Sequence, residues 1–107
     1  MRFGWFPWTR PKGQKCGKRP SLVISPDEMN RHLRTVLIAP MTTVERLYPT
    51  RVSLTFQGKR GHVALDQIRA VDRQRLVRRI GKASSATAQA VSGVLIEMFA
   101  RAQMSGP

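Results

Sequence analysis

Cysteine is almost absent from this chain of 107 residues, because Cys16 is the only one. No disulfide can therefore form within the chain, and a reducing cytoplasm is the simplest setting for it. A zinc site needs about four ligands, whereas Cys16, His32 and His62 lie far apart with no paired spacing. We therefore expect neither a metal site nor another cofactor.

The start of the chain lacks a long apolar run. Residues 1–8 are rich in aromatic side chains, but Gly4 and Pro7 interrupt them and Arg10 follows soon after. A signal peptide or a membrane span needs a continuous apolar stretch. We therefore expect neither, and no membrane partner.

Acidic residues are scarce. Six Asp and Glu stand against nineteen Lys and Arg, which gives a formal net charge of +13. Such an excess of positive charge matches a polyanion, and nucleic acid is the first partner to consider. The charge alone leaves open a nuclease, a ribosomal protein, a DNA-coating protein, a membrane-surface binder or a merely solvated basic surface.

Familiar catalytic motifs are missing too. The sequence has no glycine-rich phosphate loop, no metal-ligand cluster and no readable serine-histidine-carboxylate set. An enzyme built from this chain must work with Arg, Thr, Asp and His. RNA suits that inventory, because its 2′-hydroxyl supplies the nucleophile and the protein needs only to align it, move protons and stabilise charge.

The length indicates one domain, residues 1–107, in which residues 1–19 form an atypical first strand and basic loop. The strand is predicted over Phe3 to Trp8 and the mobile loop from about Thr9 to Lys18. Further strands are predicted at residues 21–25, 35–41, 51–57, 62–65 and 77–81. The glycine-flanked segment 58–61 predicts a hairpin turn.

Two helices are predicted in the C-terminal half. Asp72 is placed to cap a short helix that ends near Leu76, and Ser84 and Ser85 are competent caps for a longer one. Apolar residues recur at helical spacing behind these serines: Ala88, Val91, Val94, Leu95, Met98 and Phe99. They predict an amphipathic helix packed on a sheet, with Met98 and Phe99 in the core.

On the sheet, Val52, Leu54 and Phe56 alternate with polar residues and should face that core. The whole pattern is mainly β with α, an α+β chain. A core this small makes self-association an attractive way to bury more apolar area.

Several segments resemble the MazF/PemK toxins in order and spacing. They are Gly17-Lys18-Arg19-Pro20, Ser25-Pro26-Asp27-Glu28-Met29-Asn30, Pro40-Met41-Thr42-Thr43, Tyr48-Pro49-Thr50 and Leu65-Asp66-Gln67-Ile68-Arg69. Arg19 and Thr42 are separated by 23 positions, a spacing similar to that in toxins of this family. The resemblance covers about residues 17–102.

The resemblance implies a small antiparallel SH3-like/CcdB-like β-barrel with a C-terminal helix, assembled as a homodimer. It implies the toxin of a toxin-antitoxin pair, a cytoplasmic mRNA interferase that inhibits growth. Such a toxin cleaves single-stranded mRNA at specific sequences, without a metal, through attack by the 2′-hydroxyl. Its partner would be a cognate antitoxin whose acidic C-terminal tail lies across the RNA groove.

Three residues are the catalytic candidates that the resemblance carries. Arg19 would hold and stabilise the phosphate, and Thr42 would donate a hydrogen bond to a phosphate oxygen. Asp66 would be the general base. Each residue also has a plainer interpretation. Arg19 could be one more arginine on a basic loop, and Thr42 could satisfy a turn. Asp66 could form an ion pair with Arg69 or Arg73.

Further residues are candidates for binding RNA. They are Lys12, Lys15, Lys18, Thr43, Arg51, Gln67, Arg69 and Arg73. We expect His32 and His62 to be surface or turn residues, since the family motif requires neither. Trp5 and Trp8 would either stack on bases or close a core or dimer face.

Two other functions remain open on the same fold. CcdB-like proteins poison DNA gyrase, but they carry a Trp-Gly-Ile tail and lack the pairing of Arg-Pro with Thr, unlike this sequence. The second alternative is a catalytically weakened relative that only binds RNA. The first sixteen residues suggest it, because toxins of this family often carry a polar side chain and a carboxylate at the positions of Gly13, Gln14 and Lys15.

Overall fold

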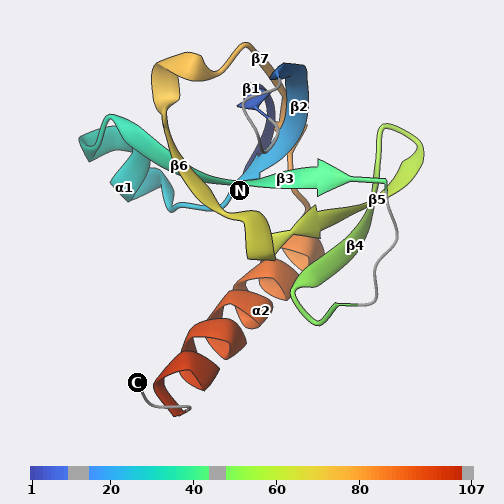
Figure 1. The fold of residues 1–107 in the computed structure, drawn as a ribbon, viewed down its shortest axis with the longest axis vertical. Coiled ribbons are helices and arrows are strands. Elements are labelled where there is room, and N and C mark those ends of the chain that lie inside the picture. Colours follow the sequence, from blue (N-terminus) through green and yellow to red (C-terminus); the bar gives the residue numbers. More distant parts are fainter. Residues whose placement is uncertain (10–14, 44–47, 105–107) are drawn as a thin grey trace.

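The computed structural model describes residues 1–9, 15–43 and 48–104 (Figure 1). Its elements are β1 (Arg2–Thr9), β2 (Lys15–Val23), α1 (Asp27–His32), β3 (Thr35–Thr42), β4 (Arg51–Phe56), β5 (Lys59–Ala64), η2 (Leu65–Gln67), β6 (Arg69–Asp72), η3 (Arg73–Arg75), β7 (Arg78–Lys82) and α2 (Ser85–Met104). Both η elements are single 3₁₀ turns.

The strands form one antiparallel, curled sheet in the order β4-β5-β3-β2-β1-β7, with β6 added on β3. β3 is shared along its length: its first half pairs with β6, its middle with β2, and Met41 and Thr42 pair with β5. The two residues that pair with β5 come directly after Pro40, which has no N–H to give to a neighbouring strand. The sheet curls into a half-barrel with α2 below it (Figure 1). The predicted fold class is confirmed.

Apolar side chains fill both faces of this sheet. One cluster lies between the sheet and α2 and includes Leu22, Met41, Val63 and Val91. The predicted core residues of β4 pack there as well, and the Phe56 ring lies 4.7 Å from that of Phe3, centroid to centroid. A smaller cluster, Phe6, Val36 and Ile38, fills the opposite, concave face.

The C-terminal helix begins where the capping serines predict. Ser84 accepts a hydrogen bond from the Thr87 backbone N–H at 3.1 Å, which satisfies an otherwise open amide of the first turn. Met98 packs against the core as expected. The prediction for Phe99 is wrong, because its side chain is 64% exposed on the far side of α2. Ile96, three residues earlier on the same helix, is exposed as well.

The basic loop is shorter than predicted. β2 begins at Lys15, so Lys18 and Arg19 belong to a strand and not to a mobile loop. The register between β1 and β2 shifts near Gly17, whose φ of 75° is the left-handed conformation that favours glycine. A bulge of this kind lets β2 continue past residues that interrupt an ordinary strand pattern.

The hairpin turn between β4 and β5 also differs from the prediction. Its two central residues are Gln57 and Gly58, both with positive φ, and β5 begins at Lys59. Positive φ at both positions makes a tight two-residue turn that matches the twist of the strands. The glycine-flanked segment 58–61 therefore belongs mostly to β5, which lengthens the hairpin.

Between β2 and β3 the structure adds a short helix, α1, that was not among the predicted elements. Ser25 and Asn30 hold it in place: the Asn30 side-chain amide donates to the Ser25 carbonyl at 3.1 Å, and the Leu37 N–H donates to the Ser25 hydroxyl at 3.1 Å. The predicted short helix after Asp72 is present as η3, and Asp72 caps it by accepting from the Gln74 N–H at 2.9 Å.

Candidate active site

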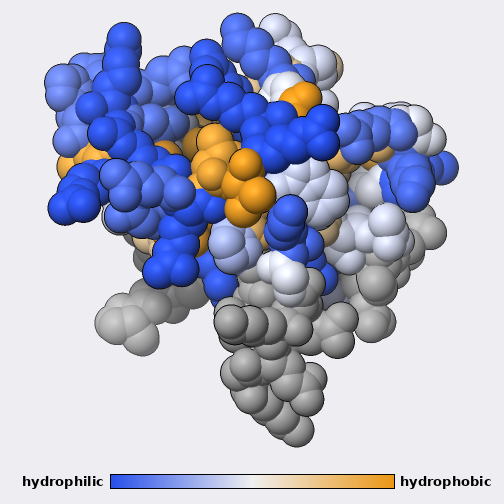
Figure 2. Space-filling view, turned by 90° about the horizontal axis from the view of Figure 1, so that it is seen from above, coloured by the Kyte–Doolittle hydropathy of each residue, from blue (hydrophilic) through white to orange (hydrophobic). Residues whose placement is uncertain are grey.

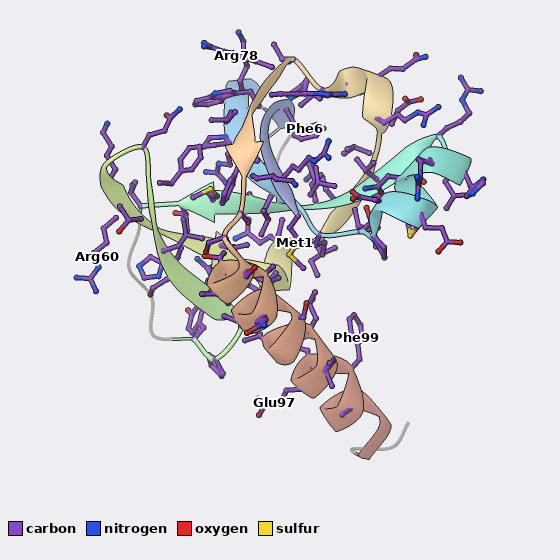
Figure 3. All side chains as sticks on the ribbon, turned by 180° about the vertical axis from the view of Figure 1, so that it is seen from behind. Met1, Phe6, Arg60, Arg78, Glu97 and Phe99 are labelled. Atoms are coloured by element: carbon purple, nitrogen blue, oxygen red, sulfur yellow. The ribbon has the colours of Figure 1, made fainter. Side chains whose placement is uncertain are left out.

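The candidate site lies on the face of β3, β4 and β5 that turns away from α2. On β4, Val52, Leu54 and Phe56 face the core next to α2, so the alternate residues Arg51 and Ser53 face the other way. On this polar face the register between β4 and β5 sets Ser53 opposite His62 and Thr55 opposite Arg60. Arg60 projects from the hairpin in Figure 3.

Arg19 and Thr42 meet the same face from neighbouring strands. β2 and β3 pair from Val23 opposite Ile38 to Ser21 opposite Pro40. Arg19 lies two residues beyond Ser21 and Thr42 two residues beyond Pro40. Both side chains therefore lie on the same side of the sheet, although the pairing of β2 with β3 ends at Ser21 and Pro40. The resemblance named these two residues together, and the alternation along the two strands places them on one face.

Asp66 is not a free carboxylate. Its Oδ1 accepts from Arg51 Nε at 2.8 Å and from the Thr50 hydroxyl at 3.2 Å, and its Oδ2 accepts from an Arg51 terminal nitrogen at 3.3 Å. The aspartate in an ion pair was the plainer alternative at this position, but its partner is Arg51 rather than Arg69 or Arg73. Neighbouring strands brought the partner into reach, since Arg51 begins β4 and Asp66 follows β5.

The pairing lowers the pKa of Asp66. Burial raises the pKa of this carboxyl, but the Arg51 hydrogen bond, a backbone N–H, the Arg51 charge and the Thr50 hydroxyl together outweigh burial and hold the pKa below its usual value. A carboxylate stabilised in this way is a weaker proton acceptor. The arrangement suits Asp66 to holding Arg51 better than to acting as a general base.

Arg51 is committed by the same contacts. Its side chain is only 9% exposed, and its guanidinium lies over the Tyr48 ring, 5.4 Å from the centroid. The structure thus places Arg51 at the end of the polar face, where its guanidinium is already paired with Asp66 and lies over the Tyr48 ring. Tyr48 is 52% exposed, and the sequence prediction had not included it.

The other predicted RNA-binding residues are scattered. Thr43 follows Thr42 and is exposed, Lys18 is exposed beside Arg19, and Gln67 is exposed on η2 next to Asp66. Arg69 lies on β6 opposite Ile38, and Lys15 begins β2. Lys12 lies outside the described residues.

Arg73 is not part of this face. Its side chain donates to the Asn30 carbonyl at 2.9 Å, at the end of the sheet that carries α1. Arg73 also helps to line a pocket of about 730 Å³ among β1, α1 and β7. None of Arg19, Thr42 and Asp66 lines that pocket, so we place the candidate site on the open face where these residues lie.

Sequence reasoning missed His62 and Ser53 as members of the site. His62 is half-buried, directly opposite Thr42 on β3, and its Nδ1 lies 3.1 Å from the Ser53 hydroxyl. The usable signal was the Gln57-Gly58 turn, because a two-residue turn there sets Ser53 opposite His62. His32, in contrast, is exposed on α1, as expected.

Within residues 1–9, 15–43 and 48–104, no three His, Cys, Asp or Glu side chains gather so that they could hold a metal ion. In the same part of the chain, no helix is long and apolar enough to cross a membrane. The face seen from above in Figure 2 is mostly hydrophilic, with a hydrophobic patch near its centre and smaller hydrophobic areas elsewhere.

The model of one protein family, described as the PemK-like, MazF-like toxin of type II toxin-antitoxin systems, matches residues 4–99. The chain belongs to this family. The match begins well before residue 17, so the family likeness includes β1 and its unusual aromatic sequence.

Individual relatives agree with this assignment. The endoribonuclease toxin MazF of Escherichia coli K12 is 32% identical over 68 residues, which are 63% of this chain and 61% of that protein. The MazE–MazF crystal structure from Deinococcus radiodurans is 29% identical, covers 92% of each chain and gives a TM-score of 0.77. An endoribonuclease solved with its cognate antitoxin, from a mycobacterial species, is 24% identical over 94% of each chain with a TM-score of 0.76, a likeness of fold.

The assignment to this family bears on the alternatives. The family match is to PemK-like, MazF-like toxins, and so it does not favour the CcdB-like alternative.

Proposed function

We propose that this chain is the toxin of a toxin-antitoxin pair, a metal-independent endoribonuclease that cleaves single-stranded mRNA at specific sequences and so inhibits growth. The mRNA substrate implies action in the cytoplasm. The observation that supports the proposal is that Arg19 and Thr42 lie on one polar face of the sheet in a chain of this family. The match to E. coli MazF spans 61% of that protein, and its activity is extended to this chain by the proposal.

The chemistry needs little from the protein. The RNA 2′-oxygen attacks the adjacent phosphorus and loses its proton, the bond from phosphorus to the 5′-oxygen breaks, and that oxygen takes up a proton. The products are a 2′,3′-cyclic phosphate and a 5′-hydroxyl. Arg19 stabilises the charge that grows on the phosphate oxygens, since a guanidinium stays charged and grips two oxygens at once. Thr42 donates one neutral hydrogen bond to the same phosphate.

Asp66 takes a supporting role in this proposal. Its carboxylate accepts two hydrogen bonds from Arg51 and one from Thr50. It therefore fixes the end of the face where Arg51 and Tyr48 lie, and the exposed Tyr48 ring is suited to stack on a base.

The remaining basic residues supply attraction rather than chemistry. A net charge of +13 favours a polyanion, and most of that attraction is independent of sequence. The same charge would receive an antitoxin with an acidic tail. The D. radiodurans relative was solved as a MazE–MazF complex, which supports a cognate antitoxin for this chain.

A homodimer is part of the proposal. α2 leaves Ile96 70% exposed and Phe99 64% exposed, three residues apart on one side of the helix. Phe99 projects outward in Figure 3. Large apolar side chains gathered on one side of a helix are typical of an interface, and a small core gains from a second copy that covers them.

The deciding experiment is cleavage of a long RNA in excess EDTA, with the new ends mapped. We expect undiminished cleavage, 5′-hydroxyl ends and 2′,3′-cyclic phosphates. A matched substrate with hydrogen in place of the 2′-hydroxyl at the scissile nucleotide should stay intact. Strict dependence on added metal, or cutting of the deoxy substrate, would refute the mechanism.

A further inference from the structure

His62 lies in the middle of a row of side chains that crosses the candidate site. The register sets it opposite Thr42 on one side and Ser53 on the other. Residues directly opposite in antiparallel strands point to the same face, with Cβ atoms about 4.5–5.5 Å apart. Thr42, His62 and Ser53 therefore stand side by side on the face that Arg19 also shares.

The imidazole is held by one of its nitrogens. Nδ1 lies 3.1 Å from the Ser53 hydroxyl, so this contact orients the ring within a half-buried position. Among the described residues, Nε2 has no hydrogen-bond partner of its own. It is the ring nitrogen that remains for a ligand.

Cleavage requires a group that takes the 2′-hydroxyl proton, and the described part of the chain offers few. The sequence has no Asp or Glu before Asp27. Asp27 and Glu28 lie on α1, Asp72 caps η3 and Glu97 lies on α2, all away from Thr42. Glu45 lies outside the described residues.

Asp66 is the remaining acid, and the hydrogen bonds that it accepts from Arg51 and Thr50 help to lower its pKa and so make it a weaker proton acceptor. Histidine is the side chain whose charge ordinarily changes between pH 5 and 8, so a neutral imidazole is an effective acceptor under those conditions.

We propose that His62 is the general base of the cleavage reaction and that Ser53 positions it. Nε2 takes the proton from the 2′-hydroxyl as the bond from the 2′-oxygen to phosphorus forms. The bond from phosphorus to the 5′-oxygen breaks, and that oxygen takes a proton from water. The imidazolium then returns its proton to solvent. This assignment rests on the proposed endoribonuclease function.

Charged groups on several elements share the face with His62. They are Arg19 from β2, Arg51 from β4, Arg60 from β5 and Asp66 from η2. Thr42 from β3 and Ser53 from β4 are its uncharged neighbours.

The test is the pH dependence of the cleavage rate at saturating RNA. For the wild type we expect the rate to rise about tenfold per pH unit below the histidine range and to level off above it, because only the neutral imidazole accepts a proton. His62→Gln keeps a side chain that can bond Ser53. It should lower the rate by about 10²–10⁴-fold and abolish the pH-dependent rise. A wild-type rate that does not change between pH 5 and 8 overturns the proposal even without the variant.

Two variants separate chemistry from structure. Ser53→Ala should reduce the rate several-fold and retain the pH-dependent rise, since it loosens the base without removing it. His32→Gln, on the exposed surface of α1, should match the wild type in rate and profile. Added imidazole should partly restore a His62→Ala variant, a rescue that a structural role does not predict.

The outcomes distinguish this inference from the function on which it rests. Cleavage by the wild type, loss of cleavage in Arg19→Ala and an unchanged profile in His62→Gln would refute the role of His62 and leave the endoribonuclease standing. A wild type that leaves every RNA intact would refute the proposed function and this inference with it.

Discussion

At the scale of single residues, the candidate site depends on which face of β2 carries a positive charge. Lys18 and Arg19 are neighbours on β2 with the same charge, but only Arg19 shares the side of the sheet that carries Thr42. A side chain that stabilises the transition state and one that attracts RNA should respond differently to removal.

Arg19→Ala should lower the cleavage rate at saturating RNA by about 10² or more, the scale of a lost transition-state donor, with a modest loss of affinity. Lys18→Ala is the matched control and should weaken binding and its salt dependence while the saturated rate stays near that of the wild type. Single-turnover rates and salt titrations measure the two effects. An Arg19→Ala protein that cuts RNA at the parental rate would show the catalytic assignment to be wrong.

The ion pair of Arg51 and Asp66 has a signature in stability. A lowered pKa means that Asp66 stabilises the fold above the ordinary carboxyl range and that this contribution disappears as the pH falls through the pKa of the folded state. Asp66→Asn should cost about 1 kcal/mol in the free energy of unfolding at pH 7 and flatten the dependence of stability on pH below about 4. Urea unfolding across pH 3–7 measures both. Unchanged stability at pH 7 would argue against a structural pair.

At the scale of elements, the β4–β5 hairpin carries the site, because its turn fixes which residues face each other across the strands. Gln57 and Gly58 both have positive φ. A one-residue slip of this hairpin would turn Ser53 and His62 to the opposite face.

Gly58→Ala should therefore destabilise the protein by about 1–2 kcal/mol, because a side chain disfavours the left-handed conformation. Gly81→Ala on β7 is the matched control: its φ is ordinary, an added Cβ meets no atom within 4 Å, and it should cost much less. Chemical denaturation compares the two. Equal losses from both substitutions would mean that the turn conformation contributes nothing special.

At the scale of the whole molecule, α2 has two unequal sides. Val91, Val94, Leu95 and Met98 pack on the core, while Ile96 and Phe99 are exposed. A paired substitution, Ile96→Glu with Phe99→Glu, should convert a dimer at micromolar concentration into a monomer with the fold intact. Ala90→Glu, at an exposed position earlier on the same helix, adds charge without removing an apolar contact and should leave the dimer unchanged. Sedimentation equilibrium gives the mass. A wild type that sediments as a clean monomer would remove the basis for this interface.

Much of the architecture was predictable from local pattern. The alternation of Val52, Leu54 and Phe56, the Asp72 cap and the Ser84 cap each depend on residues close in sequence, and all three are found. Phe99 shows where pattern fails, because hydrophobicity marks a side chain for burial without saying whether the chain or a second molecule covers it.

The sequence by itself determined the class of fold and the basic character, which follow from periodicity and composition, and its resemblance to the MazF/PemK toxins named Arg19 and Thr42 as candidates. The tertiary structure alone decided which side chains bind each other and which lie side by side on one face. Arg51 and Asp66 are 15 positions apart and bind each other, and His62 joins Thr42 only through the register of two strands. Contacts of this kind depend on how separate strands align, and a change of one residue in a turn moves every side chain to the other face.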